Sequence, residues 1–340
     1  ASGIGGDSTD LDFAIAKYLP NGTLDPSFGN DGKVLTKVST GADLLRGMII
    51  QPDLKIVVAG VADELWYPDP CIARYLPDGM LDPSFGVDGI VRVDLGTSGG
   101  HGYAIALQSD GKLVVVGRRY QSGVADEFVV VRLLSDGALD TSFGTNGVVT
   151  THVTDGTDVL VSVVIQPDGK ILAGGNVGSP PSRSFALVRY MPNGSLDMSF
   201  GTDGIVQSSV SPIGRDAAWS IALRPDGSIL LGGASEYSST VSSAVLLAFT
   251  SDGSPDVTFS TDGVDSPPFP TGYVIGRSLL VQPDGKILFT GTSDNTNEDF
   301  ALCRYLSDGS LDPTFGTNGM VSTNIDLHDE GTALALDAIG

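Results

Sequence analysis

The sequence predicts an all-β protein, a six-bladed β-propeller built from four-stranded antiparallel blades. One phrase, typified by residues 76–86 (LPDGMLDPSFG), recurs six times with a spacing of 56 to 59 residues, which indicates a repeat architecture. Apolar residues come in short runs between Asp-Gly turns, with no helical period, as expected of short strands. We therefore expect a single domain spanning residues 1–340. Its repeats are centred on Phe28, Phe85, Phe143, Phe200, Phe259 and Phe315.

One repeat, read from Gly102, contains four candidate strands. Residues 103–108 and 112–117 flank the turn Ser109-Asp110-Gly111 and predict a hairpin. A variable loop precedes a third strand at residues 128–134, and the recurrent phrase then leads to a fourth at residues 147–151. Four antiparallel strands per repeat are typical of a propeller blade.

The hairpin turn has the same chemistry in most repeats. Sister copies read Pro-Asp-Gly at residues 167–169, 225–227 and 283–285, where Pro fixes the first corner and Gly adopts the left-handed position. Leu54 stands in place of that glycine after Pro52-Asp53. We expect this turn to be strained or of a different type.

The recurrent phrase has a structural interpretation. Its Asp, as in Asp82-Pro83-Ser84-Phe85, is suited to cap a single turn, and its Phe then points inward. A cation in the third strand of the same repeat is placed to pair with that Asp; these cations are Lys17, Arg74, Arg132, Arg189 and Arg304. The fifth copy departs from the pattern at Ala248, Pro255 and Ser260.

The two ends of the chain complement each other. Residues 13–18 read as a third strand without the strands that should precede it, and residues 333–336 read as a first strand with nothing after it. We expect one blade to be shared between the termini, with residues 1–6 as its second strand. Such a seam would pair exposed strand edges and close the ring.

The charge balance excludes several partners. With 41 acidic and 19 basic residues the net charge is -22, which repels nucleic acid and anionic membrane surfaces. No apolar run reaches the length of a membrane helix. Cys71 and Cys303 are the only cysteines, and we expect no disulfide between them. The low Cys and Lys content favours an extracellular or cell-surface protein. We also expect the protein to be a monomer.

Two phrases carry a resemblance to a known family. Gln-Pro-Asp-Gly-Lys-Ile, at residues 166–171 and 282–287, and Leu-Asp-Pro-Ser-Phe-Gly, at residues 81–86, are similar to the delta-sixty repeat of bacterial β-propellers. The resemblance covers essentially the whole chain and carries no catalytic signature. It implies a propeller associated with the cell envelope or with secretion.

Candidate ligand-binding residues lie in the loops that vary between repeats. In an up-and-down propeller these loops open on one face, and cations and aromatics gather there and at the start of the first strands, as expected of a surface that binds a sugar or a protein. The candidates are Arg46, Trp66, Tyr67, Tyr103, Arg118, Tyr120, Trp219, Tyr273 and Arg277.

Four acids occupy one repeat position near the expected central opening. Asp43, Asp158, Asp216 and Asp329 stand at equivalent places and could form a partial carboxylate ring that holds Ca²⁺ or another divalent cation. Alternatively, each Asp accepts hydrogen bonds from its own loop. The sequence leaves both interpretations open.

Catalysis has weaker support than binding. His101, His328 and Glu330 lie near the start of first strands and are the candidate acid-base groups. The sequence holds no nucleophile motif or phosphate-binding loop. The leading expectation is therefore a binding module for a carbohydrate or protein partner. The alternatives are a metal-assisted lyase or hydrolase on the same face and a scaffold domain of a larger surface protein.

Overall fold

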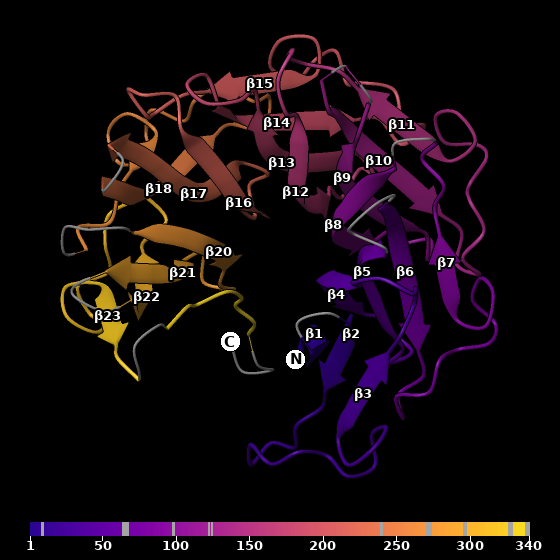
Figure 1. Ribbon diagram of the computed structural model, residues 1–340. Coiled ribbons are helices and arrows are strands. Elements are labelled where there is room, and N and C mark those ends of the chain that lie inside the picture. The colour runs from indigo at the N-terminus through magenta and orange to yellow at the C-terminus, as the bar shows by residue number, and fades with distance from the viewer. Residues whose placement is uncertain are drawn as a thin grey trace. The chain divides into compact units, whose positions relative to one another are not determined.

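The computed structural model describes most of the chain and divides it into two compact units. Unit 1 comprises residues 1–165 and 192–195, and unit 2 comprises residues 166–191 and 196–340. The described residues are 1–7, 10–62, 68–96, 99–121, 123, 125–238, 241–269, 274–294, 298–325 and 329–336. Each repeat supplies one blade (Figure 1), and the fold is the predicted all-β six-bladed propeller.

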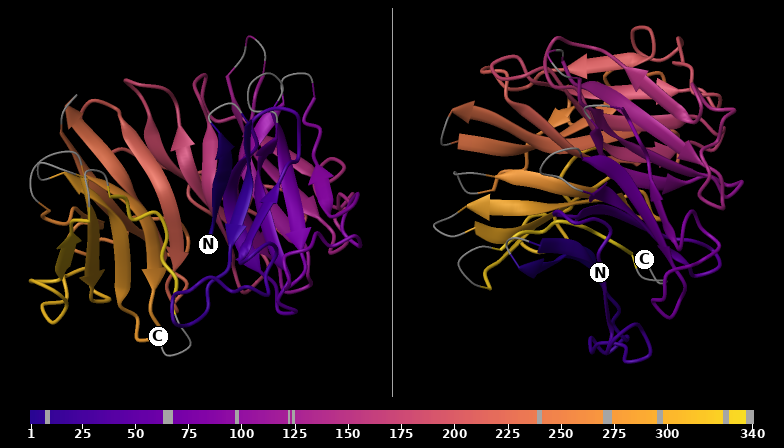
Figure 2. Two further views of the ribbon diagram at one scale, coloured as in Figure 1. Left: turned by 60° about the horizontal axis from the view of Figure 1, so that its bottom comes forward. Right: turned by 45° about the vertical axis from the view of Figure 1, so that its right-hand side comes forward.

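Unit 1 holds the first three blades and one strand of the fourth. The strand order in each sheet follows the sequence. Figure 2 shows the sheets of this unit, coloured indigo to magenta, stacked face to face. The strands are β1 (Ser2–Asp7), β2 (Asp10–Ala16) and β3 (Lys33–Thr36); β4 (Leu44–Ile50), β5 (Ile56–Ala62), β6 (Asp69–Tyr75) and β7 (Ile90–Arg92); β8 (Gly100–Leu107), β9 (Leu113–Arg119), β10 (Glu127–Leu133) and β11 (Val148–Thr151); and β12 (Val159–Ile165).

Unit 2 holds the rest of the fourth blade and the last two blades. Antiparallel pairing again joins strands that are consecutive in the sequence. The strands are β13 (Ile171–Val177), β14 (Ser184–Tyr190) and β15 (Ile205–Ser208); β16 (Asp216–Leu223), β17 (Ile229–Ser238), β18 (Val241–Phe249) and β19 (Val264–Asp265); and β20 (Ile275–Val281), β21 (Ile287–Asp294), β22 (Glu298–Tyr305) and β23 (Met320–Thr323).

The first sheet differs from the expected shared blade. Residues 2–7 do form its second strand, since β1 pairs with β2 along its whole length. The sheet has only three strands, however, and the described residues 329–336 form none. The five other first strands are each joined to a second strand by a tight turn. Residues 333–336 have no such local partner, and pairing them with a distant segment carries a larger loop-closure cost.

Burial explains the strand composition. The second and third strands of the blades consist largely of β-branched and small residues, and β5 is buried at every position. Between the second and third blades these strands build a core with Val57, Ile72, Val115 and Val131. Side chains on both faces of these strands are buried, so the strands read as continuous apolar runs.

The recurrent phrase fastens neighbouring blades. Phe85 is fully buried and lies against Gly137, a glycine in the turn of the next repeat whose φ is 92°. The Gly86 amide donates to the Asp136 carbonyl of that same turn at 2.8 Å. A side chain at position 137 would both strain the backbone and clash with the ring. The phrase is therefore structural, as predicted.

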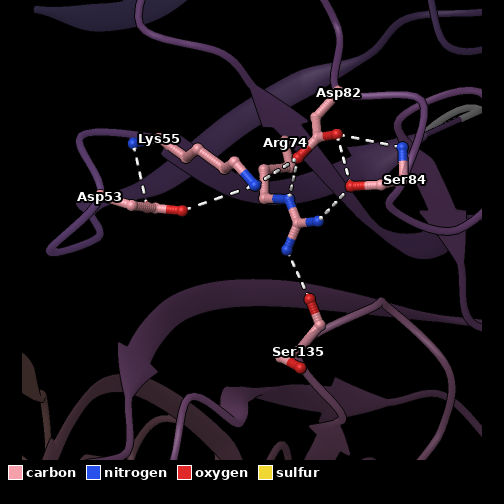
Figure 3. A network of polar contacts seen from close by, with 6 residues as sticks. All are labelled: Asp53, Lys55, Arg74, Asp82, Ser84 and Ser135. Carbon is pink, nitrogen blue, oxygen red and sulfur yellow. Dashed lines mark hydrogen bonds and ion pairs between the residues drawn. The ribbon is translucent and has the colours of Figure 1, made fainter.

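A buried ion pair completes the fastening (Figure 3). The Arg74 Nε donates to Asp82 at 2.8 Å, and the guanidinium stacks on the Phe85 ring at 4.5 Å. Arg74 also donates to the Ser135 carbonyl in the next repeat, while Lys55 approaches Asp82 at 3.1 Å. The predicted pairing of third-strand cation and capping Asp is confirmed in five repeats. The pairs are Lys17–Asp25, Arg74–Asp82, Arg132–Asp140, Arg189–Asp197 and Arg304–Asp312.

The fifth repeat replaces the missing cation from another strand. Position 248 is alanine, and Arg224, which follows β16, reaches Asp256 at 2.6 Å and lies 5.3 Å from the centre of the Phe259 ring. It also donates to the Ser307 carbonyl in the next repeat at 3.0 Å. The same three contacts are thus made by an arginine from a different place in the sequence.

The turn at Leu54 is strained, as predicted. Leu54 has a φ of 66°, in the left-handed region that a side chain disfavours. Its amide still donates to the Gln51 carbonyl at 2.8 Å, so the glycine-type turn is kept despite the substitution.

Acid is expected to destabilise the fold through the capping aspartates. Hydrogen bonds from Ser27, then Lys17, lower the pKa of Asp25 from 3.8 to about 2. Burial opposes ionisation of Asp82, but bonds from Ser84 and Lys55 outweigh it and lower its pKa further. The unfolded chain binds these protons more readily than the folded chain. The contribution of these aspartates to the free energy of unfolding is therefore fully present above about pH 4, and it is lost as the pH drops through 2. Urea unfolding between pH 5 and pH 2 measures how the free energy of unfolding depends on pH. Asp82→Asn should make this dependence weaker than in the natural protein. An equally steep dependence in both proteins would contradict the role given to Asp82.

The two cysteines remain unpaired, as predicted. Cys71 and Cys303 are buried free thiols, and burial raises the pKa of both. Across the described ranges, no helix is long and apolar enough to cross a bilayer.

Candidate functional site

The start of each first strand is held by the blade before it. The backbone amide at one repeat position donates to a carbonyl at the start of the third strand of the preceding blade. Examples are Asp43 to Leu11 at 2.7 Å and Gly100 to Pro68 at 2.7 Å. Asp329 bonds Glu298 in the same way at 2.7 Å. The C-terminal segment therefore begins like a first strand although it does not continue as one.

The four aspartates proposed as a carboxylate ring act on their own loops. Asp43 accepts from the Val38 and Ser39 amides at 2.7 and 3.0 Å and from the Ser39 hydroxyl at 2.5 Å. Asp158 accepts three equivalent bonds. Asp216 accepts four bonds, one from Ser235, and Asp329 accepts from Ile325 at 2.6 Å.

These contacts match the local interpretation of the four acids. In the part of the chain that the structure describes, no group of three or more His, Cys, Asp or Glu side chains is close enough to hold a metal ion. Three hydrogen bonds from its own loop already occupy each of the Asp43 and Asp158 carboxylates.

Each of four first strands contains a β-bulge at the same place. The pairing register shifts between Leu45 and Gly47 in β4 and between Gly102 and Ala104 in β8, with equivalent shifts in β16 and β20. A bulge leaves one residue unpaired and re-aims its side chain. The unpaired residues are Arg46, Tyr103, Trp219 and Arg277, all of them predicted ligand-binding residues.

A glycine in the second strand makes room for each bulge. A Cβ on Gly117 would lie 1.8 Å from the His101 carbonyl oxygen, and one on Gly60 would lie 2.0 Å from the Leu44 oxygen. Gly233 and Gly291 face the equivalent carbonyls at 2.1 and 1.8 Å. No real side chain tolerates such distances, so these glycines are required by the bulged geometry.

In unit 1 the bulge residues belong to a cluster around His101. The two ring nitrogens contact the hydroxyls of Tyr103, at 3.0 Å, and Tyr120, at 3.2 Å. Arg118 donates to the Tyr120 hydroxyl at 2.5 Å and lies over its ring. Arg46, from the preceding blade, lies 5.8 Å from the centre of the Tyr103 ring. We call these five residues the His101 cluster.

Burial and charge determine the protonation of this cluster. His101 is only 5% exposed, and burial, with Arg118 and Arg46, lowers its pKa to about 4. The imidazole is therefore neutral at pH 7. Burial also raises the pKa of Tyr120, against the effect of Arg118. The predicted acid-base residue His101 lies beneath the surface, whereas Tyr103, Arg118 and Tyr120 are half-buried and Arg46 is exposed.

Unit 2 contains a second pair of bulge residues. Arg277 stacks on the Trp219 ring at 4.4 Å, and Trp219 is 39% exposed. Trp219 is therefore a surface residue and not part of the core. Glu330, a predicted catalytic candidate, pairs with Arg277 at 3.5 Å.

Several predicted residues lie outside the described part of the chain. The structure gives no placement for four of them. They are Trp66, Tyr67, Tyr273 and the candidate acid-base residue His328.

Two features of the site escaped sequence reasoning. Asp126 pairs with Arg118 at 3.5 Å, and burial raises the pKa of its carboxyl while Arg118 opposes the shift. The glycines behind the bulges were also missed. A signal existed for them, because every second strand from the second repeat on carries Gly at its fifth residue.

Solved structures with a similar fold have very different sequences. A polysaccharide lyase of family PL25, an ulvan lyase bound to -[GlcA(1-4)Rha3S]-, shares 10% identity at a TM-score of 0.50, over 94% of this chain and 81% of the lyase. A glucose dehydrogenase shares 12% identity at a TM-score of 0.46, over 82% of this chain and 87% of that one. At such identities the likeness concerns the fold alone. No curated protein sequence matches the chain.

A family profile, by contrast, matches more than half of the chain. The profile is described as a domain of unknown function (DUF5122) β-propeller, and it matches six times, once in each repeat. The matched segments are residues 4–28, 51–85, 108–143, 166–200, 224–259 and 282–315. Each segment ends at the Phe of the recurrent phrase, and all lie outside the residues of the bulges. The chain belongs to the DUF5122 β-propeller family.

Proposed function

We propose that this protein is a saccharide-binding propeller whose contact residues are those of the β-bulges. The observation that carries the proposal is the stacking of cation on aromatic at the bulges, Arg46 on Tyr103 and Arg277 on Trp219. Aromatic rings bind the apolar faces of sugars, and cations and hydroxyls bind their polar groups. A bulge interrupts the regular hydrogen bonding between two strands. Four bulges at the same repeat position therefore support a role beyond the scaffold.

The position of these residues in the repeat supports the same proposal. The scaffold contacts, the buried Phe and the Arg–Asp pair, lie in the recurrent phrase and its partner strand. The four bulge residues are of three types, Arg, Tyr and Trp, while the residue behind each of them is always glycine. Variation on a constant frame is typical of a recognition surface.

An enzyme is the second candidate, and the His101 cluster favours it. A neutral imidazole bonded to two phenols, with Arg118 beside one of them, can move a proton to or from a bound sugar. In this mechanism Tyr103 is the acid-base group in contact with substrate and His101 positions it. A lyase or hydrolase assisted by a metal at Asp43, Asp158, Asp216 or Asp329 would have to share those carboxylates with the hydrogen bonds of their own loops.

We further propose that the protein works as a single extracellular or cell-surface domain spanning residues 1–340. The low content of Cys and the acidic surface support that location, and the delta-sixty resemblance of the phrases agrees with it. A monomeric binding module and a scaffold domain of a larger surface protein both fit this arrangement.

Replacing Trp219 by alanine is expected to weaken saccharide binding about tenfold, the loss expected for one stacked aromatic. A panel of immobilised oligosaccharides identifies ligands of the natural protein, and calorimetry then compares the variants. Tyr237→Ala is a matched control, because Tyr237 is on the neighbouring strand β17 of the same unit and is equally exposed, at 39%. Unchanged binding by a folded Trp219→Ala protein would contradict the proposal for unit 2.

A further inference from the structure

The hydrogen bonds of the His101 cluster have a direction, which begins at Arg118. A guanidinium only donates, so the Tyr120 oxygen accepts from Arg118 Nη2 at 2.5 Å. Burial raises the pKa of Tyr120, so the hydroxyl keeps its proton at neutral pH. Among the described residues, the hydrogen-bond acceptor in contact with that hydroxyl is the His101 Nε2, 3.2 Å from the Tyr120 oxygen.

The direction continues through the imidazole. His101 is neutral at pH 7, because burial and the nearby Arg118 and Arg46 hold its pKa near 4. A neutral imidazole carries one N–H. With Nε2 accepting from Tyr120, the proton resides on Nδ1 and is donated to the Tyr103 oxygen at 3.0 Å.

The proton left over is that of the Tyr103 hydroxyl. Among the described residues, the Tyr103 oxygen has one hydrogen-bond contact, with His101, and accepting that bond leaves its own proton for another acceptor. Consecutive hydrogen bonds polarise one another, so the last donor is strengthened by the bond that Arg118 donates to Tyr120. Tyr103 is half-buried at the bulge with Arg46 beside its ring. An anionic acceptor gains most in this setting, since a bond to a charged group is about twice as strong.

On the basis of the proposed saccharide-binding function, we infer that the His101 cluster recognises an acidic saccharide, with a carboxylate or sulfate oxygen of the sugar accepting the Tyr103 hydroxyl proton beside Arg46. Tyr103 is the contact residue. His101, Tyr120 and Arg118 are positioning residues that set which way the Tyr103 proton faces.

Calorimetry with three probes tests the inference: an oligogalacturonate, a neutral galactan oligosaccharide of equal length and a sulfated form of that neutral oligosaccharide. We expect at least one acidic probe to bind about tenfold more tightly than the neutral one. Tyr103→Phe should lower acidic-probe affinity by about 10- to 100-fold and leave the neutral probe almost unchanged. Tyr18→Phe, an exposed tyrosine of the same unit, is the control and should change nothing.

The tautomer of His101 provides a readout that is independent of any ligand. In ¹⁵N NMR spectra of the full chain, Nδ1 should carry the proton. Tyr120→Phe removes the donor to Nε2, so it should shift the tautomer toward Nε2–H and reduce the ratio of acidic to neutral affinity.

The possible outcomes separate the two proposals. Equal binding of neutral and acidic probes, an equal loss of all three in Tyr103→Phe, or a proton on Nε2 in the natural protein would overturn this inference and leave saccharide binding intact. If none of the three probes binds and the panel yields no saccharide ligand, both proposals fail. A carboxylate-only or sulfate-only preference supports the inference and identifies the acceptor.

Discussion

Replacing Arg74 by methionine is expected to lower the free energy of unfolding by about 3 kcal/mol, the lower end of the cost of breaking a buried ion pair, because Lys55 still approaches Asp82 at 3.1 Å. Arg74 and Asp82 are 5% and 3% exposed, so water does not replace the lost partner. The substitution also removes the stacking on Phe85 and the bond to Ser135 in the next repeat. Urea unfolding at pH 7 measures the change.

Lys17→Met is the matched control, because Lys17 holds the same repeat position but its side chain is 44% exposed. An exposed pair contributes about 1 kcal/mol or less. The double variant Arg74→Met with Asp82→Asn should recover part of the loss, since the amide is neutral and its oxygen still accepts from Ser84. If Arg74→Met costs no more than Lys17→Met, the ion pair does not fasten the blades.

Gly117→Ala is expected to have the second large effect, on both stability and the site. Its Cβ would meet the His101 carbonyl at 1.8 Å, and a backbone oxygen cannot move aside like a flexible side chain. Overpacking of this kind costs about 1 to 3 kcal/mol or more. Relief requires β8 to lose its bulge, which would move His101 and Tyr103 together.

The comparison with Gly3→Ala isolates this effect. Gly3 lies in β1 without a positive φ, and a Cβ added there would have no other atom within 4 Å, so its replacement should be nearly neutral. We expect Gly117→Ala to lower the melting temperature and to change the His101 imidazole NMR signals. A folded variant with unchanged His101 signals would show that the glycine is not required by the bulge.

The sequence was sufficient for features that repeat. The six blades, the pairing of Arg74 and its equivalents with the capping Asp, the second strand in residues 2–7 and the strain at Leu54 all follow from local patterns. Each of these depends on residues close together in the chain or on one position compared across six copies. Local turn chemistry and period are what a single sequence records best.

Features that depend on neighbouring strands and blades were predicted poorly. Arg46, Tyr103 and Trp219 were singled out as candidates, but not the bulges that expose them, because a register shift is a property of two paired strands. The replacement of the missing cation at Ala248 by Arg224 requires knowing that two strands of one blade meet. The expected strand at residues 333–336 relied on its place in the repeat, without the turn that holds the other first strands.

The bulges also have an evolutionary consequence. A residue that is left out of strand pairing can be exchanged without re-registering the sheet, while the glycine opposite preserves the space it occupies. Four such positions, carrying Arg46, Tyr103, Trp219 and Arg277, can therefore change one at a time. Under the proposed binding function, ligand preference can diverge by single substitutions at these four places, at little risk to folding.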